Sequence, residues 1–196
     1  HFFMPSVPEK SFYYPSSFID KSGHIYILDR STDQILIFTL DGIRRGEIQL
    51  NYAPEQINYA QNINRIYVQN TGNIITYVDL DSDLKENFFL KISNRVSAIE
   101  AIGDDVLIST NELLTTGSVF YLYNAQGTLL DSTDYLLGTA EAWSEDNLVY
   151  HEASGYIYYI KATSTHPLCR FKLRNKKFPP YNDPDEICVD NPTIYH

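Results

Sequence analysis

Three glutamates stand where carboxylate chemistry could occur. Glu55, Glu100 and Glu141 each lie in or beside a short segment that precedes a strongly apolar run. Carboxylates that converge from such segments could hold a divalent cation through their oxygen atoms, as a metal-dependent hydrolase requires. Because neighbouring side chains of a strand point to opposite faces, not all of the nearby polar residues can share one space. A polar, solvated wall without a metal is the other interpretation.

A second group of carboxylates has the spacing of a calcium-binding loop. Asp79, Asp81 and Asp83 form the pattern D-x-D-x-D. An EF-hand loop also needs Gly at the sixth position and Glu at the twelfth, where this chain has Leu84 and Leu90. Asp and Ser are also common in ordinary turns. We therefore predict no cofactor, and a weak surface Ca²⁺ site is the alternative.

None of the catalytic motifs that we considered is complete. His151 and Glu152 begin an H-E-x-x-H pattern, but Gly155 occupies the place of the second histidine. The chain contains no G-x-S-x-G, no P-loop and no G-x-G-x-x-G. Cys188 has no evident base to activate it as a nucleophile. We predict no catalytic residues, which favours a non-enzymatic protein.

Aromatic side chains offer a different kind of chemistry. Trp143 is the only tryptophan, and Tyr156, Tyr158 and Tyr159 lie on one expected strand, with Tyr156 and Tyr158 on the same face. Exposed aromatic residues near loops often stack on sugars or anchor protein partners, although packing between sheets is the common alternative. We select Trp143 and Tyr156, together with Glu55, Glu100 and Glu141, as candidate ligand-binding residues.

An internal repeat predicts the elements that position these side chains. In each of four segments an apolar strand is followed by a polar turn, a second apolar strand and another turn. Ile25, Ile66, Val106 and Leu148 occupy the same place in the four segments, at spacings of 41, 40 and 42 residues. Four short strands in a unit of roughly 40 residues are typical of β-propeller blades. We predict an all-β fold, a β-propeller with four four-stranded blades, and a run of separate β-meanders is the alternative.

The predicted blades divide a single domain, 1–196, into 15–50, 54–91, 96–133 and 138–175, with 176–196 as a connector or the start of a further blade. We expect the innermost strands at 17–20, 56–59, 98–101 and 140–143, where they line the central channel. A constant offset from the apolar anchors places Phe18, Ile99 and Glu141 at equivalent positions on these strands.

Two segments resemble a known family. The segment PSSFIDKSGHIYILDRSTDQILIFTLDG, residues 15–42, resembles an NHL-type blade. Together with CRFKLRNKKFPP, residues 169–180, it resembles the six-bladed NHL-like propellers of exported lipoproteins from Bacteroidetes-type bacteria. The resemblance implies a six-bladed NHL/TolB-like propeller that binds a partner outside the cytoplasm. Propeller enzymes of the lactonase type make a metal-dependent hydrolase or lactonase the alternative function.

The chain length leaves the ring size open. A six-bladed ring at this period needs about 250 residues, and this chain has 196. Four blades of a larger ring, a closed four-bladed ring and a ring completed by a second copy are all consistent with this length. The first arrangement exposes an edge strand at each end of the run of blades.

Charge and composition limit the partners. A net charge of −10 disfavours nucleic acid and anionic membrane surfaces, and no apolar run of 18 residues could span a membrane. The first ten residues, HFFMPSVPEK, do not resemble a signal peptide, so we expect it to be absent or already removed. Cys169 and Cys188 could pair in an exported protein, but two cysteines do not define a disulfide framework.

These observations together predict a non-enzymatic binding or scaffold module outside the cytoplasm, in the periplasm or at the cell surface. Loops on one face of the propeller would recognise a carbohydrate, a peptide or a protein partner, because binding residues concentrate on loops that a rigid scaffold positions.

Overall fold

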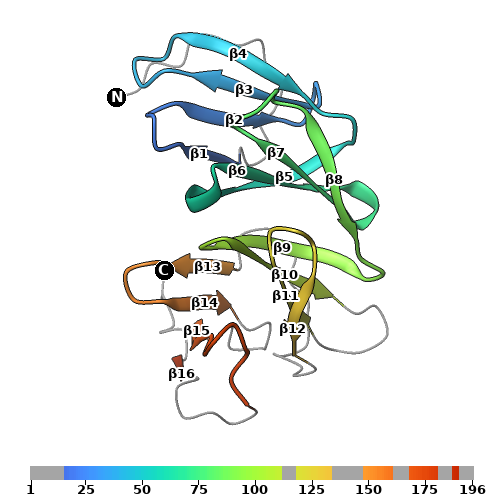
Figure 1. Ribbon diagram of the computed structural model, residues 1–196, viewed down its shortest axis with the longest axis vertical. Helices are drawn as coiled ribbons and strands as arrows, with labels where there is room; N and C mark the ends of the chain where they lie inside the picture. The colour runs from blue at the N-terminus through green and yellow to red at the C-terminus, as the bar shows by residue number, and fades with distance from the viewer. Residues whose placement is uncertain (1–15, 112–117, 134–147, 161–167, 181–186, 190–196) are drawn as a thin grey trace, which may run out of the picture.

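The computed structural model describes residues 16–111, 118–133, 148–160, 168–180 and 187–189. These residues form four antiparallel sheets of four strands each (Figure 1), and within each sheet the strands pair in the order in which they follow along the chain. The helices in these ranges are two single 3₁₀ turns, Gln61–Ile63 (η1) and Thr71–Asn73 (η2). No helix among the described residues is long and apolar enough to cross a membrane.

The first two sheets follow the predicted blades closely. Sheet 1 contains β1 (Ser17–Ile19), β2 (Ile25–Asp29), β3 (Gln34–Phe38) and β4 (Arg44–Gln49). Sheet 2 contains β5 (Pro54–Ala60), β6 (Arg65–Asn70), β7 (Ile74–Asp79) and β8 (Glu86–Lys91). The inner strands expected at 17–20 and 56–59 correspond to β1 and β5.

The third and fourth sheets contain the remaining strands. Sheet 3 contains β9 (Arg95–Ile102), β10 (Asp105–Asn111), β11 (Ser118–Tyr123) and β12 (Leu129–Ser132). Sheet 4 contains β13 (Leu148–His151), β14 (Tyr156–Ile160), β15 (Leu168–Lys172) and β16 (Ile187–Val189). The inner strand expected at 140–143 lies outside the described residues. Within 176–196, where we predicted a connector or the start of a further blade, β16 pairs with β15 and belongs to sheet 4.

Short polar side chains and glycines shape the turns between strands. In the β1–β2 turn the Asp20 carboxylate accepts hydrogen bonds from the backbone N–H groups of Ser22 and His24, each at 2.8 Å. Asn124 accepts the corresponding two bonds in the β11–β12 turn. Gly127, in that same turn, has a φ of 80°, a conformation that costs glycine little because it has no Cβ.

The hydrophobic core of the described residues contains three clusters, each between two neighbouring sheets. Adjacent residues of β6 serve different clusters, because Ile66 packs toward sheet 1 whereas Tyr67 packs toward sheet 3. The same alternation in β10 sends Val106 toward sheet 2 and Leu107 toward sheet 4. These middle sheets are buried on both faces, which explains the continuous apolar runs 66–68 of β6 and 106–108 of β10.

Stacking of the sheets brings their first strands together. β1 contacts β5, β5 contacts β9, and β9 contacts β13. Figure 1 shows the four sheets following one another around an arc, with β1, β5, β9 and β13 on its inner side and β4, β8, β12 and β16 toward the outside. The predicted all-β fold is therefore confirmed. The strands β1, β5 and β9 meet as the repeat predicted, whereas β13 corresponds to the strand predicted as the second of its blade.

A disulfide lies in sheet 4. Cys169 of β15 is completely buried and disulfide-bonded, and the other cysteine of the chain, Cys188, is its register partner in β16. The sequence left this pairing open, because it did not indicate that 187–189 would form a strand beside 168–172.

Candidate functional site

The strand registers place three inner-strand residues at equivalent positions. Phe18 of β1, Asn58 of β5 and Glu100 of β9 each lie opposite the residue that follows the apolar anchor of the next strand. The predicted equivalence of Phe18 with Ile99 is wrong by one residue. Its constant offset fails because the separation between paired residues differs: it is 8 residues from Phe18 to its partner in sheet 1, 9 from Asn58 in sheet 2 and 7 from Glu100 in sheet 3. Glu141 lies outside the described residues.

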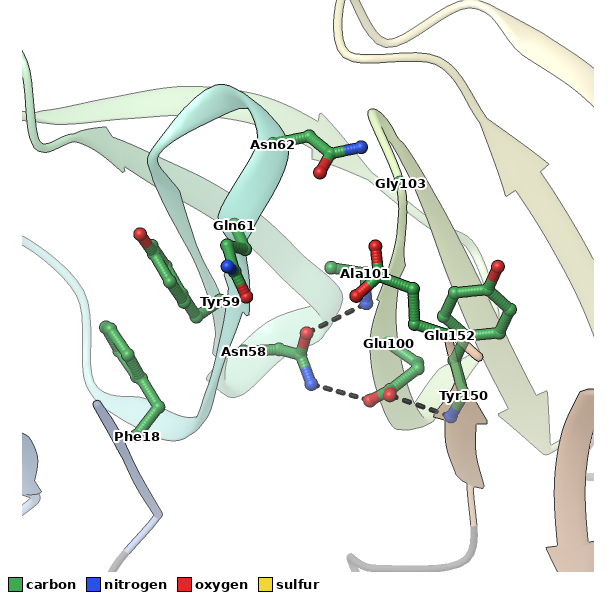
Figure 2. A pocket seen from close by; sticks show the side chains of 10 residues that line it. All are labelled: Phe18, Asn58, Tyr59, Gln61, Asn62, Glu100, Ala101, Gly103, Tyr150 and Glu152. Atoms are coloured by element: carbon green, nitrogen blue, oxygen red, sulfur yellow. Dashed lines mark hydrogen bonds between the residues drawn. The ribbon is translucent and has the colours of Figure 1, made fainter. Parts of the chain in front are cut away.

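All three equivalent residues line one pocket with a volume of about 270 Å³. The pocket opens where β1, β5, β9 and β13 approach one another, and the turns that follow β5, β9 and β13 supply the rest of its lining (Figure 2). Its other lining residues are Tyr59, Gln61, Asn62, Ala101, Gly103, Tyr150 and Glu152.

Glu100 joins three sheets on one side of this pocket. Its carboxylate accepts a hydrogen bond of 2.6 Å from Nδ2 of Asn58 in sheet 2 and one of 2.9 Å from the backbone N–H of Tyr150 in sheet 4. Asn58 Oδ1 in turn accepts the backbone N–H of Ala101 at 2.8 Å. Figure 2 shows these three bonds as one continuous chain across the pocket. We call Asn58, Glu100 and Tyr150 the Glu100 bridge.

The electrostatic environment of the Glu100 bridge is unusual. Burial raises the pKa of the Glu100 carboxyl above its ordinary value of 4.5, and the hydrogen bonds from Tyr150 and Asn58 only partly oppose this effect. Both donors are neutral, so they do not compensate the negative charge. Glu152, at the rim, is a second carboxylate. The lining residues within the described part of the chain include no lysine, arginine or histidine.

Aromatic rings flank the polar residues. Phe18 is stacked between Tyr26 and Tyr59, with centroid distances of 4.8 Å and 4.6 Å. The Tyr59 hydroxyl donates to Asn64 Oδ1 at 2.7 Å, which fixes the ring at its far end. In Figure 2 the Tyr59 and Tyr150 rings lie on opposite sides of the Glu100 carboxylate. The pocket thus combines carboxylates, side-chain amides and aromatic faces, which suits the binding of a polar ligand.

The structure brings Glu100 into this site but separates it from the other predicted residues that it describes. Glu55 lies toward the opposite end of β5, where its carboxylate accepts a hydrogen bond of 3.0 Å from Gln69. Tyr156 lies on β14, with the Arg170 guanidinium 4.4 Å from its ring centroid and the Lys172 ammonium 4.3 Å from it. Neither lines the pocket. Trp143 and Glu141 lie outside the described residues.

Sequence reasoning missed the partners of Glu100. Asn58 is a polar residue in the middle of an inner strand, which was a usable signal, whereas the Tyr150 contact comes from a backbone N–H that no residue type reveals. Glu152 was noticed only as part of an incomplete zinc motif. Its position after β13, rather than that motif, brings it to the pocket.

The three aspartates of the calcium-like pattern each contact a different partner. Asp79 forms an ion pair of 2.6 Å with Arg65, Asp81 accepts a hydrogen bond from Asn64, and Asp83 pairs with Lys85. Within the described ranges no three His, Cys, Asp or Glu side chains are grouped so that they could hold a metal ion.

The comparisons with known proteins identify the fold of this chain but not its function. No family model and no curated protein matches the chain. Among solved structures, the β-propeller domain of Cps50 (Swd1) from Myceliophteria thermophila matches with a TM-score of 0.62 at 14% identity, over 88% of this chain and 56% of that one. The nidogen/laminin complex matches with a TM-score of 0.61 at 14% identity, over 81% and 60%. Hydrazine synthase from Kuenenia stuttgartiensis gives 0.60 at 13% identity, over 82% and 51%.

This chain therefore spans between 51% and 60% of the length of these three solved structures. At such identities the likeness establishes the architecture, and the predicted β-propeller fold is confirmed. Unrelated functions share this fold, so function has to be argued from the pocket itself.

Proposed function

We propose that this chain is a non-enzymatic binding module that recognises a peptide, protein or carbohydrate partner through the pocket at the Glu100 bridge. The observation that supports this proposal is the convergence of three sheets on a single pocket. A carboxylate, an amide and a backbone N–H are held there in a fixed arrangement by hydrogen bonds. Ligand sites are typically concave, with a few convergent polar groups among aromatic side chains.

A protein partner is consistent with the propeller neighbours. One of the matching solved structures is a complex of nidogen with laminin, in which a propeller-containing chain takes part in an assembly of proteins. Rigid stacked sheets that present short turns are suited to this use, because the turns are held in place before binding and little order has to be gained.

We further propose that the module works outside the cytoplasm, as part of a six-bladed NHL-like propeller. The disulfide at Cys169 supports this location, because disulfides persist mainly in oxidising compartments. The similarity of residues 15–42 and 169–180 to exported lipoproteins of Bacteroidetes-type bacteria also favours it.

The geometry favours binding over the alternative of a metal-dependent hydrolase or lactonase. Such an enzyme would need several carboxylates to converge on one cation. The two predicted glutamates among the described residues do not converge: Glu55 bonds to Gln69 toward the opposite end of β5, whereas Glu100 lines the pocket.

A pocket-blocking variant tests the proposal. Asn62 is exposed and lines the pocket mouth, so Asn62→Trp should fill the entrance without disturbing the core. Asn87→Trp, on the exposed outer strand β8, is the matched control. On peptide, protein and glycan panels, partners bound by the wild type should be lost by Asn62→Trp and kept by Asn87→Trp. Binding that survives Asn62→Trp, or panels without any partner, would contradict the proposed pocket.

A further inference from the structure

We propose that the pocket at the Glu100 bridge takes a basic side chain, an arginine guanidinium or a lysine ammonium, from a partner polypeptide. This inference rests on the proposed function and names the chemistry of the ligand.

Charge is the first reason. Glu100 and Glu152 contribute two carboxylates, and none of the described residues that line the pocket is basic. An anionic ligand would therefore meet uncompensated repulsion, whereas a cation would gain from both carboxylates. The net charge of −10 on the chain would also attract a basic partner during its approach.

The partners of Glu100 are the second reason. Its two hydrogen bonds come from a side-chain amide and a backbone N–H, neither of which carries charge. Two other carboxylates on the same chain meet a cation: Asp105, which is only 6% exposed, lies 2.7 Å from Nζ of Lys176, and Asp79 pairs with Arg65. A half-buried carboxylate is stabilised most by an opposite charge, and a ligand could supply that charge here.

The chain itself contains the arrangement that we expect the ligand to form. The Arg65 guanidinium bonds to the Asp79 carboxylate at 2.6 Å and lies 4.0 Å from the centroid of the Tyr77 ring. The pocket presents the same two components, a carboxylate and a tyrosine ring, at Glu100 and Tyr150. A guanidinium entering the pocket could bond the carboxylate and stack on a ring at once, as cations over aromatic faces do.

Pocket size limits the ligand further. A volume of about 270 Å³ lies below the range of about 300–1,000 Å³ that is usual for small-molecule sites. Such a pocket suits one long side chain better than an oligosaccharide. The Tyr59 ring could contact the aliphatic part of that side chain, since arginine and lysine readily bury their methylene groups.

The test compares a blocked glycyl-arginyl-glycine tripeptide with its citrulline analogue, which has a similar shape but no charge. Titration calorimetry should show that the wild-type chain binds the arginine peptide at least about tenfold more tightly, because a close charge pair is lost with citrulline. Glu152→Gln should weaken the arginine peptide about threefold, the size expected for an exposed charge pair. Glu47→Gln removes the same charge from exposed β4, outside the pocket, and should leave affinity unchanged.

The outcomes separate this inference from the proposed function. Equal binding of the arginine and citrulline peptides would overturn the basic side chain as ligand. The inference would also be overturned if the arginine peptide does not bind but a neutral sugar, or Ca²⁺ alone, binds and Asn62→Trp abolishes that binding. The pocket would then still be a binding site, and the proposed function would stand. If arginine, lysine, sugar and Ca²⁺ probes all fail to bind, or bind equally well to Asn62→Trp, both the inference and the proposed pocket fail.

Discussion

Asn58 should be the residue whose removal loosens the junction between sheets 2 and 3. Asn58→Ala removes the 2.6 Å bond to the Glu100 carboxylate and leaves the Ala101 N–H without its 2.8 Å acceptor. A neutral hydrogen bond contributes about 1 kcal/mol net, and one to a charged group about 1.5–3 kcal/mol. The two bonds together would then contribute about 2.5–4 kcal/mol. Because both are only partly buried and water can replace the Asn58 side chain, we expect the free energy of unfolding to fall by about 2–3 kcal/mol, near the lower end of this range.

Urea denaturation measures this loss through the transition midpoint at constant slope. Asn87→Ala is the control, since the Asn87 side chain lies on the exposed surface and donates only to Lys85 two residues away. It should change the free energy of unfolding by less than about 0.5 kcal/mol.

A double-mutant cycle then isolates the bond itself. Glu100→Gln combined with Asn58→Ala should be less destabilising than the sum of the single changes, with a coupling of at least about 0.5 kcal/mol. Strict additivity, or an Asn58→Ala protein as stable as the control, would refute the Glu100 bridge.

Three further outcomes can be measured with the same methods. Because the folded pKa of Glu100 lies above its ordinary value of 4.5, its stabilising contribution is fully present below that value and is lost as the pH rises through the folded pKa. The advantage of wild type over Glu100→Gln should therefore shrink across that window; a pH-independent difference would contradict the raised pKa. Reduction of the disulfide at Cys169 should lower the free energy of unfolding by about 2–4 kcal/mol, and Cys169→Ser should be insensitive to reductant; equal stability with and without reductant would argue against the bond. Tyr156→Leu should cost about 1 kcal/mol through lost cation–π contacts and leave pocket binding intact, so a loss of binding would restore Tyr156 as a ligand contact.

The sequence predicted the sheets well, because the repeat is a physical constraint that each blade obeys. Ile25, Ile66, Val106 and Leu148 all begin or nearly begin the strand predicted for them. A sheet buried on both faces needs consecutive apolar residues at the centre of its second strand, and this need keeps the period visible even where turns vary.

The site was harder to predict, because it depends on turn lengths and on contacts between blades. A difference of one or two residues in the first turn shifts the register, so that Glu100 rather than Ile99 lies level with Phe18. A shift of one residue in a strand exchanges its two faces. The backbone N–H of Tyr150 carries no signal in its residue type, and the pairing of Cys169 depends on a strand that composition alone did not indicate.

The most direct test of the pocket observes Asn58 while a ligand enters. In an ¹⁵N-labelled chain, the side-chain amide signal of Asn58, assigned with Asn58→Ala, reports on its bond to Glu100. Titration with the arginine tripeptide should move this signal in a saturable manner and leave the Asn87 side-chain amide in place. If the Asn58 signal stays fixed while the chain binds a partner, the pocket at the Glu100 bridge is not the binding site.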